Sequence, residues 1–332
     1  DQTKLRNTLT YDLFAQADYA HHLAFPVTVY RNGGFYGLFD LVEEGDTEYL
    51  QRLGLNPDNP LYKVNNGLND AYVNVEKKSR EYEDHADFQE VVDAAQNLSG
   101  AAALTWDFDN VDIADMINYL AISNVAVSSD FGHKNMYWYR DTLGTGLWSV
   151  LPWDQDLSLG HQWDANVSPP YFKDDLITNL NVFLGGNSVF QRLYADPTFR
   201  EMYVRRVRTL ADKFYGAEGS PTIDSYLAQH ILQLEPLIAD EAVQDAKFWG
   251  IQANFTHTPA QAADQLINEF IPLRRDFVNG LAVVPDSQVG SPEIRFDLVD
   301  YDADPASGLQ TEEYVRLNNP NGFAVDISGW RI

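Results

Sequence analysis

The sequence predicts an α+β fold in which strands and helices fill different stretches of the chain, and two observations lead to this. Residues 25–64 and 136–152 hold short apolar runs separated by turn residues, a pattern typical of antiparallel strands. Residues 187–279 instead repeat apolar side chains at helical spacing. The chain has 332 residues, of which 45% are hydrophobic, so it is long enough for two or three domains with a substantial core.

The N-terminal elements follow from this pattern in order. Residues 1–20 place their leucines on one face and are predicted to form a helix. The runs FPVTVY (25–30) and FYGLFDLV (35–42) flank an Asn-Gly turn and predict a hairpin. A short helix over 46–53 and a strand over 61–64, LYKV, are expected next.

The middle of the chain is predicted to be mostly helical. The strands 136–140 and 147–152 form a second hairpin, and 161–186 is rich in loop residues. Gly100 is expected to stop the first of the later helices, because glycine is frequent just past a helix end. The predicted helices are 84–100, 112–127, 187–195, 197–215, 222–240 and 259–279.

The pattern of apolar residues changes from helical spacing to alternation near residue 283. We expect a domain over 1–282, a flexible linker over 283–292, and a β-module over 293–332, where EIRFDLVDYD, EEYVRLNN and AVDISGWRI alternate like strands. Three strands leave the edges and half the core of a sandwich uncovered. We therefore expect this β-module to be truncated and the chain to be a fragment of a longer protein.

Charge and composition exclude several functions. The chain has 49 acidic against 23 basic residues, a net charge of -26, so nucleic acid and anionic lipid are not expected partners. It has no cysteine, which excludes zinc-thiolate sites, thiol catalysis and disulfides. No apolar run reaches the roughly 20 residues that cross a bilayer, and the first residues do not have the pattern of a signal peptide.

The most informative acids lie between residues 130 and 160. Asp130 and Asn135 are separated by four residues on a loop after an apolar helix, and the hairpin returns the chain to Asp154 and Asp156 in WDQD. Phosphoryl transfer needs an aspartate for the acceptor hydroxyl, and an Asn and an Asp that hold magnesium. The D-x4-N spacing alone is weak, because a chain with 49 acids contains it by chance. An ordinary turn or acidic surface explains each residue equally well.

A nucleotide site also needs a cation for the phosphates. Lys63 stands inside the apolar strand LYKV, where an unpaired ammonium is costly. We expect Glu43, at the end of the preceding hairpin, to be its partner. A purely structural ion pair remains the alternative. The glycines of 32–37 resemble a phosphate loop only loosely, and a plain hairpin turn explains them as well.

Other catalytic motifs are missing from the sequence. It contains no P-loop, no G-x-S-x-G, no H-E-x-x-H and no EF-hand loop. His21 and His22 have no further ligands at metal spacing. A glycosidase pair of carboxylates stays possible, since any two of the many acids could face each other.

The segments around these residues resemble the spore coat CotH kinase family. The resemblance rests on YRNGGFYGLFDLVEEGDTEYL and LYKV, and on SSDFGHKNMYWYRD and GLWSVLPWDQDLSLG, which ends at Gly160. FWG and FIPLRRDF, with Arg274 and Arg275, are similar to the helical end of that family, so that the resemblance covers about residues 5–280. The tail EEYVRLNNPNGFAVDISGWRI is similar to the opening of a lamin-tail domain.

This resemblance implies an atypical protein-kinase-like fold with a small β-rich lobe and a larger helical lobe, followed by a truncated immunoglobulin-like β-sandwich. It implies binding of ATP with Mg²⁺ (or Mn²⁺) and phosphorylation of serine on a protein. The family has further N-terminal strands, so part of the small lobe is expected upstream. The roles implied by position are catalysis by Asp130, nucleotide binding by Lys63 and Glu43, and metal binding by Asn135, Asp154 and Asp156.

The leading hypothesis is therefore a protein serine kinase of the CotH type that acts on exported or surface proteins of a bacterium. A catalytically silent extracellular scaffold, with assembly partners at the cell surface, is the second hypothesis. A carbohydrate-active hydrolase is the third. Convergence of Asp130, Asn135, Asp154 and Asp156 on one cleft with Lys63 opposite would favour the kinase.

Overall fold

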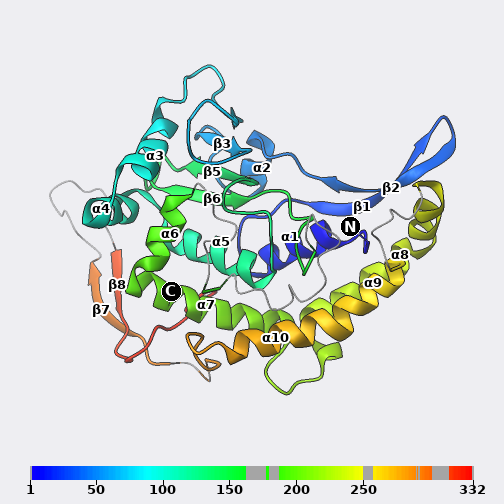
Figure 1. Cartoon of the computed structure of the whole chain (residues 1–332). Helices are drawn as coiled ribbons and strands as arrows, with labels where there is room; N and C mark the ends of the chain where they lie inside the picture. The colour runs from blue at the N-terminus through cyan, green and yellow to red at the C-terminus, as the bar shows by residue number, and fades with distance from the viewer. Residues whose placement is uncertain are drawn as a thin grey trace.

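The structure is a computed structural model, and it describes residues 2–161, 177–178, 187–249, 257–288, 290, 292–300 and 314–330. Most of the predicted loop 161–186 lies outside these residues. The described chain combines two β-hairpins and a four-stranded sheet with a long layer of helices (Figure 1). The prediction of a mixed fold of helices and strands is confirmed.

The first hairpin is formed by β1 (Ala24–Arg31) and β2 (Gly34–Val42), which follow helix α1 (Arg6–Gln16). Its turn places Asn32 at φ 53° and Gly33 at φ 80°. Two successive left-handed residues suit the right-handed twist of the strands, which is why Asn-Gly stands there. The hairpin projects from the body of the molecule beside the end of α8 (Tyr226–Trp249) (Figure 1).

The second sheet positions the candidate site. Its four antiparallel strands run in the order β4 (Val75–Lys77), β3 (Leu61–Val64), β5 (Met136–Arg140) and β6 (Trp148–Pro152). The register pairs Lys63 with Tyr137 and Tyr137 with Leu151. These three side chains therefore share one face of the sheet.

Both faces of this sheet are covered. On one face, Tyr62 stacks on Phe88 of α3 (Ala86–Asn97) with ring centroids 4.7 Å apart, and Trp138 stacks on Phe190 of α6 (Ser188–Ala195). On the other face, Tyr49 and Leu50 of α2 (Thr47–Arg52) complete a smaller buried cluster. Because both faces are buried, the strands read as nearly continuous apolar runs.

The helices supply the larger layer of the fold. Beside α1 and α2 they are α3 (Ala86–Asn97), α4 (Gly100–Asn110), α5 (Ile113–Val125), α6 (Ser188–Ala195), α7 (Pro197–Tyr215), α8 (Tyr226–Trp249), α9 (Pro259–Gln265) and α10 (Ile271–Gly280). A π-helical turn, Leu266–Phe270, joins α9 to α10, so the predicted helix 259–279 is confirmed as one continuous run.

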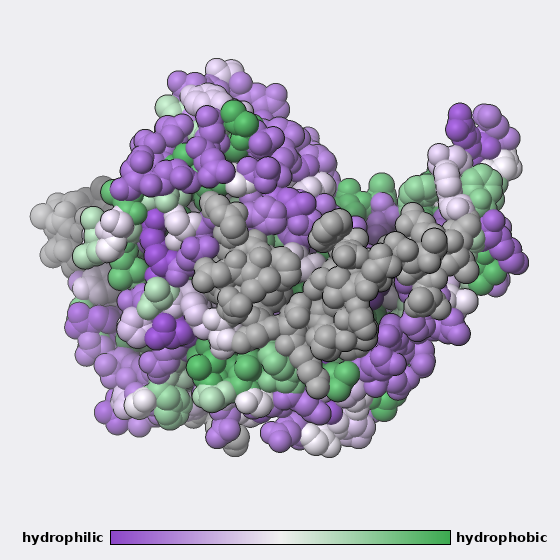
Figure 2. Space-filling view, viewed as in Figure 1, coloured by the Kyte–Doolittle hydropathy of each residue, from purple (hydrophilic) through white to green (hydrophobic). Residues whose placement is uncertain are grey.

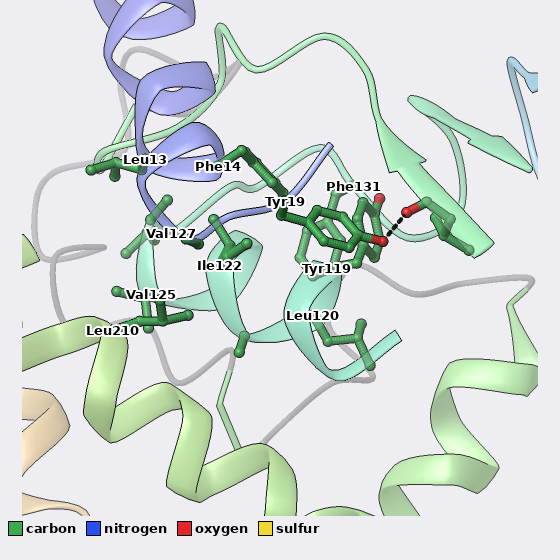
Figure 3. Packing of buried hydrophobic residues seen from close by; sticks show 14 of the residues in the cluster. Leu13, Phe14, Tyr19, Tyr119, Leu120, Ile122, Val125, Val127, Phe131 and Leu210 are labelled. Carbon is green, nitrogen blue, oxygen red and sulfur yellow. Dashed lines mark hydrogen bonds between the residues drawn. The ribbon is translucent and has the colours of Figure 1, made fainter. Parts of the chain in front are cut away.

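The main core lies where α1, α5 and α7 meet the sheet. Figure 3 shows Phe14 and Tyr19 from the N-terminal segment packed beside Tyr119 of α5. The Tyr19 hydroxyl donates a hydrogen bond to the carbonyl oxygen of Val150, on the edge strand β6, at 2.5 Å. That contact covers part of a strand edge that would otherwise be open.

Two sequence predictions are wrong in their boundaries, and two elements were not predicted. Gly100 does not end a helix but begins α4, with φ 59°, and its left-handed backbone separates α3 from a helix that was not predicted. Strand β4 was not predicted, because three residues are too few to show alternation. Helix α8 continues to Trp249 instead of ending at 240, although Pro236 lies inside it.

The C-terminal part forms only one hairpin among the described residues, β7 (Arg295–Asp300) with β8 (Tyr314–Asn318). Residues 324–330 form no strand, so an immunoglobulin-like sandwich is not shown. Arg205 on α7 donates to the carbonyl oxygens of Ala324 and Asp286 at 3.1 and 2.7 Å. Within the predicted linker 283–292, the carbonyl of Asp286 therefore contacts α7.

Most of the coloured residues on the face drawn in Figure 2 are hydrophilic, as the net charge leads one to expect. Lighter and apolar residues gather at the base of the first hairpin, at the right of that view. Phe25, Phe39 and Leu41 are between 42% and 52% exposed there. Within the described chain, no helix has both the length and the apolar character that a membrane span requires.

Candidate active site

The candidate site is built on the loop between α5 and β5, residues 126–135. Fully buried Arg274 of α10 donates to the carbonyl oxygen of Asn124 at 2.6 Å and so caps the end of α5. Val127 then adopts φ 51°, and Ser128 N–H bonds back to the carbonyl of Ser123. A left-handed residue after a helix turns the chain sharply, which directs the loop towards the sheet.

A second segment, residues 155–159, lies against this loop. Ser129 N–H donates to the carbonyl of Leu157, and Leu159 N–H donates to the carbonyl of Ala126. The Ser128 hydroxyl also bonds Oε1 of Gln155 at 2.9 Å, and Gln155 is completely buried. These hydrogen bonds bring the loop that carries Asp130 beside the segment that follows β6.

Asn135 connects the two acids of the site. Its Nδ2 donates to Oδ2 of Asp130 at 3.1 Å and to the carbonyl oxygen of Asp130 at 3.0 Å. Its own carbonyl accepts from the N–H of Trp153 at 3.1 Å, next to Asp154. Both Asn135 and Asp154 adopt left-handed backbone, with φ 58° and 52°. Such backbone is uncommon outside glycine and concentrates at functional sites.

The electrostatics show that the acids lie close together. Burial, the neighbouring carboxylate of Asp156 and the charge of Asp130 together raise the pKa of Asp154 to about 6. Lys134 acts in the opposite direction, and its ammonium lies 2.8 Å from Oδ2 of Asp130. The structure therefore brings together Asp130, Asn135, Asp154 and Asp156, as the sequence suggested.

Asp156 also borders a cavity of about 210 Å³ beneath β2. Lys4, Asn7, Leu38, Phe39 and Asp40 form the rest of its wall. Burial raises the pKa of Asp40, and the charge of Asp156 adds to this effect. The acidic site thus continues towards the first hairpin.

Lys63 has different neighbours from those predicted. Its Nζ lies 3.9 Å from the ring centroid of Trp153 and 3.8 Å from Oε1 of Glu44. Glu43 instead binds Arg52, at 2.6 and 2.8 Å, and the backbone N–H of Leu23. The predicted Lys63–Glu43 pair is therefore wrong, because adjacent residues point apart and only Glu44 faces β3. Lys63 still lies beside the residue that precedes Asp154.

The histidines have a structural position near the same strand end. His22 is buried, stacks on Tyr49 at 4.2 Å, and contacts the carbonyl oxygens of Glu43 and Pro152 at 2.9 Å. Burial lowers the pKa of His22 to about 4, against the effect of these carbonyls. The ring of His22 thus lies between the end of β6 and the end of β2.

The donor set suits a hard divalent cation. Asp154 and Asp156 repel each other, and neither forms an ion pair with a lysine or arginine in the part of the chain that the structure describes. Carboxylate and amide oxygens are the ligands that Mg²⁺ prefers, and Asn135 and Asp154 supply one of each. Among the described residues, however, no group of three or more histidines and acids is arranged as a metal site.

Sequence reasoning did not single out Lys134. It lies four residues after Asp130, and opposite charges at this spacing meet readily on a compact turn or helix. The spacing of Asp130 and Lys134 in DFGHKN could therefore have indicated this ion pair. Gln155, which fastens the two loops together, gave no comparable signal, since its partner Ser128 is 27 residues away.

Comparison with known families agrees with this arrangement. The family model described as CotH kinase protein matches residues 1–278. This is most of the chain, so the protein belongs to the CotH kinase protein family. Among curated proteins, no match to the chain is found. The family supports a protein-kinase-like function for the site.

Proposed function

We propose that this CotH kinase protein is an ATP- and Mg²⁺-dependent protein serine kinase that acts on exported or surface proteins. The observation that carries the proposal is the placement of Asp130, Asn135 and Asp154 around one strand end. Phosphoryl transfer depends on positioning and on neutralising charge, and these side chains offer a base and two oxygen ligands.

Asp130 is the residue that receives the acceptor hydroxyl. As the serine oxygen attacks the γ-phosphorus, the bond from that phosphorus to ADP breaks, and the hydroxyl proton passes to the Asp130 carboxylate. Asn135 holds this carboxylate through its Nδ2 at 3.1 Å. The side chain of Asp130 is one fifth exposed, so a hydroxyl of another protein can reach it.

Asn135 and Asp154 are the residues that would hold magnesium, with Asp156 beside them. Bound Mg²⁺ neutralises charge on the phosphates. Before binding, the raised pKa of Asp154 shows that its carboxylate lacks compensation. We assign to Lys63 the support of the nucleotide phosphates or of Trp153, and to Glu44 rather than Glu43 the role of its partner.

The test measures nucleotide binding and phosphate transfer separately. We expect Mg²⁺ with ATP to raise the melting temperature, because a ligand of the folded state stabilises it, and labelled phosphate to appear on serines of dephosphorylated casein. Asp154→Asn should abolish the metal-dependent part of the shift. Asp130→Asn should leave the shift nearly unchanged and reduce transfer by a factor of about 100 or more.

The matched control is Asp109→Asn, an exposed acid on α4, which should change neither measurement. A wild-type protein that shows neither a shift nor transfer would contradict the proposal, and the scaffold function would then be preferred. The exported or surface location is a separate part of the proposal. Fractionation of the producing cells with an antibody to the chain tests it.

A further inference from the structure

A cavity of about 450 Å³ lies at the outer edge of β6, the last strand of the sheet. Its wall comes from the end of α1 and the segment after it, the end of α2 and the segment after it, Asp115 of α5, and Ser149 and Leu151 of β6. The volume is within the range of about 300–1,000 Å³ in which small-molecule sites fall. None of the four residues of the candidate active site borders this cavity, so the cavity, here called the β6 pocket, is a separate place in the fold.

Apolar side chains form much of the wall of the β6 pocket. Leu53 and Leu55 follow α2 and Leu151 belongs to β6, and all three also take part in the smaller buried cluster of the sheet. The Tyr19 hydroxyl is bonded to the carbonyl oxygen of Val150 (Figure 3), so it is not available to a ligand. A molecule that fills the pocket therefore needs an apolar body.

Asp115 provides the charged group of the β6 pocket. Its side chain is half-buried, and Ser149 donates a hydrogen bond to it. Burial is the main reason why the pKa of Asp115 rises to about 6, and the nearby charge of Asp112 acts in the same direction as burial. Among the described residues, no lysine or arginine forms an ion pair with Asp115. This carboxylate therefore borders the cavity without a cation that compensates its charge.

The other charged side chains of the pocket do not supply that cation. Arg52 is bound by Glu43, with N···O distances of 2.6 and 2.8 Å, and its Nη2 also donates to the carbonyl oxygen of His21. Asp18, which is exposed at the rim, adds a second carboxylate to the wall. When Glu43 is counted with Arg52, negative charge exceeds positive charge around the pocket, and this favours a cationic ligand.

We propose that the β6 pocket binds a small organic ammonium ion, whose charged group pairs with Asp115 and whose apolar body lies against Leu53, Leu55 and Leu151. An ammonium that donates to a carboxylate forms a charge-assisted hydrogen bond, which is stronger than a neutral one. This is a second binding function of the chain, beyond the proposed kinase, and it needs no nucleotide.

Other classes of ligand match these walls less well. An anion is repelled by Asp18 and Asp115, and a hydrated metal ion leaves the leucines without a partner. A neutral apolar molecule displaces water from Asp115 and leaves its charge uncompensated. A primary amine with a short aromatic or aliphatic body satisfies both parts of the pocket at once.

The first experiment measures binding by isothermal titration calorimetry without nucleotide, at a pH above the pKa of Asp115. The probe is 2-phenylethylamine, and 2-phenylethanol and 3-phenylpropanoate are the matched molecules with a neutral and an anionic group. We expect the amine to bind at least about 10-fold more tightly than the alcohol, and the carboxylate not to bind. Equal binding of amine and alcohol, or no binding of the amine, would overturn the proposal.

The second experiment locates the site with two variants. Asp115→Asn keeps the shape of the side chain and removes its charge, so the advantage of the amine over the alcohol should fall below about 3-fold. Ala15→Leu fills the pocket from α1 and keeps the charge, so it should weaken the amine and the alcohol by similar factors of about 5 or more. Asp109→Asn makes the same change at an exposed position of α4; it is the matched control and should bind the probes like the wild type.

Melting temperatures show whether each variant is folded. Should Asp115→Asn not fold, since Asp115 lies in the first turn of α5, Ala15→Leu and the comparison of the three probes still decide. A preference for the amine that persists in Asp115→Asn would overturn the role of this carboxylate, and unchanged binding in Ala15→Leu would overturn the location. A protein that binds the amine but shows neither ATP binding nor transfer would contradict the proposed kinase and support this site.

Discussion

Two of the hairpins, β5–β6 and β7–β8, have apolar strand sequences and very different surroundings. In β5–β6, Trp138, Val150 and their neighbours are buried on both faces of the sheet. In β7–β8, Phe296 is 62% and Val299 52% exposed. The sequence predicts a strand in both places, but the burial of each strand depends on the layers that other parts of the chain supply. Only the buried hairpin can hold charged groups in fixed positions at its end.

The largest expected effect is in the buried hairpin. Trp138→Ala should lower the free energy of unfolding by about 3–5 kcal/mol, because it removes a ring packed against Phe88, Trp148 and Phe190 and leaves a cavity. Urea denaturation followed by circular dichroism measures the change. A loss below about 1 kcal/mol would mean that the sheet is not the centre of the core.

The second prediction concerns the site at the end of this hairpin. The pKa of Asp154 is about 6 in the folded protein and 3.8 ordinarily, so folding favours its protonated form. The carboxylate therefore destabilises the folded state above pH 6, and this cost disappears as the pH falls towards 3.8. Asp154→Asn should raise the unfolding free energy by about 1–3 kcal/mol at pH 8.

Measurement at two pH values checks this sign. Near pH 3.5 the two proteins should have equal stability, because Asp154 is then protonated in both the folded and unfolded states. The exposed acid Asp109 provides the control, since Asp109→Asn should change stability little at either pH. Equal destabilisation by Asp154→Asn at both pH values would show that this carboxylate makes favourable contacts rather than unfavourable ones.

The third prediction concerns the segment after the exposed hairpin. Arg206 and Asp326 form an ion pair at 3.2 Å whose side chains are 9% and 7% exposed. Asp326→Asn should loosen residues 319–330 from α7 at a cost of about 1–2 kcal/mol, since Arg206 keeps its bonds to Asn118 and Ala17. Hydrogen exchange should rise in that segment and stay unchanged in β5–β6.

The control for the segment is a surface pair in β7–β8. Asp297 and Arg316 are 46% and 61% exposed, so Asp297→Asn should not alter exchange in residues 319–330. If both variants loosened the segment equally, the contact with α7 would not be what holds it.

The sequence predicted which side chains lie close together better than it predicted what surrounds them. The sequence alone indicated that one strand end carries Asp130, Asn135 and Asp154. A short hairpin returns the chain to the place where its first strand begins, so the residues before and after the hairpin lie close together. The partner of Lys63 could not be predicted, since β2 pairs with β1 and not with the sheet that carries Lys63. Whether Glu43 or Glu44 faces β3 depends on that packing.

Other contacts and helix boundaries could not be predicted from the neighbouring sequence. Arg205 and Ala324 meet across 119 residues, and nothing in either stretch indicates the other. The beginning of α4 at Gly100 was read as an end, because glycine is common past helix termini and its left-handed φ of 59° fits either place. Long-range packing and the direction of the chain at such turns decide these cases.

The smallest expected effect completes the comparison of the hairpins. Val299→Ala in β7 should change the free energy of unfolding by no more than about 0.5 kcal/mol, because half of the side chain is already in contact with water. Val150→Ala in β6, where the same side chain is completely buried, should cost about 2–3 kcal/mol. Urea denaturation of the two variants side by side measures the difference. Equal losses would mean that Val299 is covered in solution. A melting temperature that depends on protein concentration would then indicate a second copy of the chain, and one that does not would indicate a contact within the same chain.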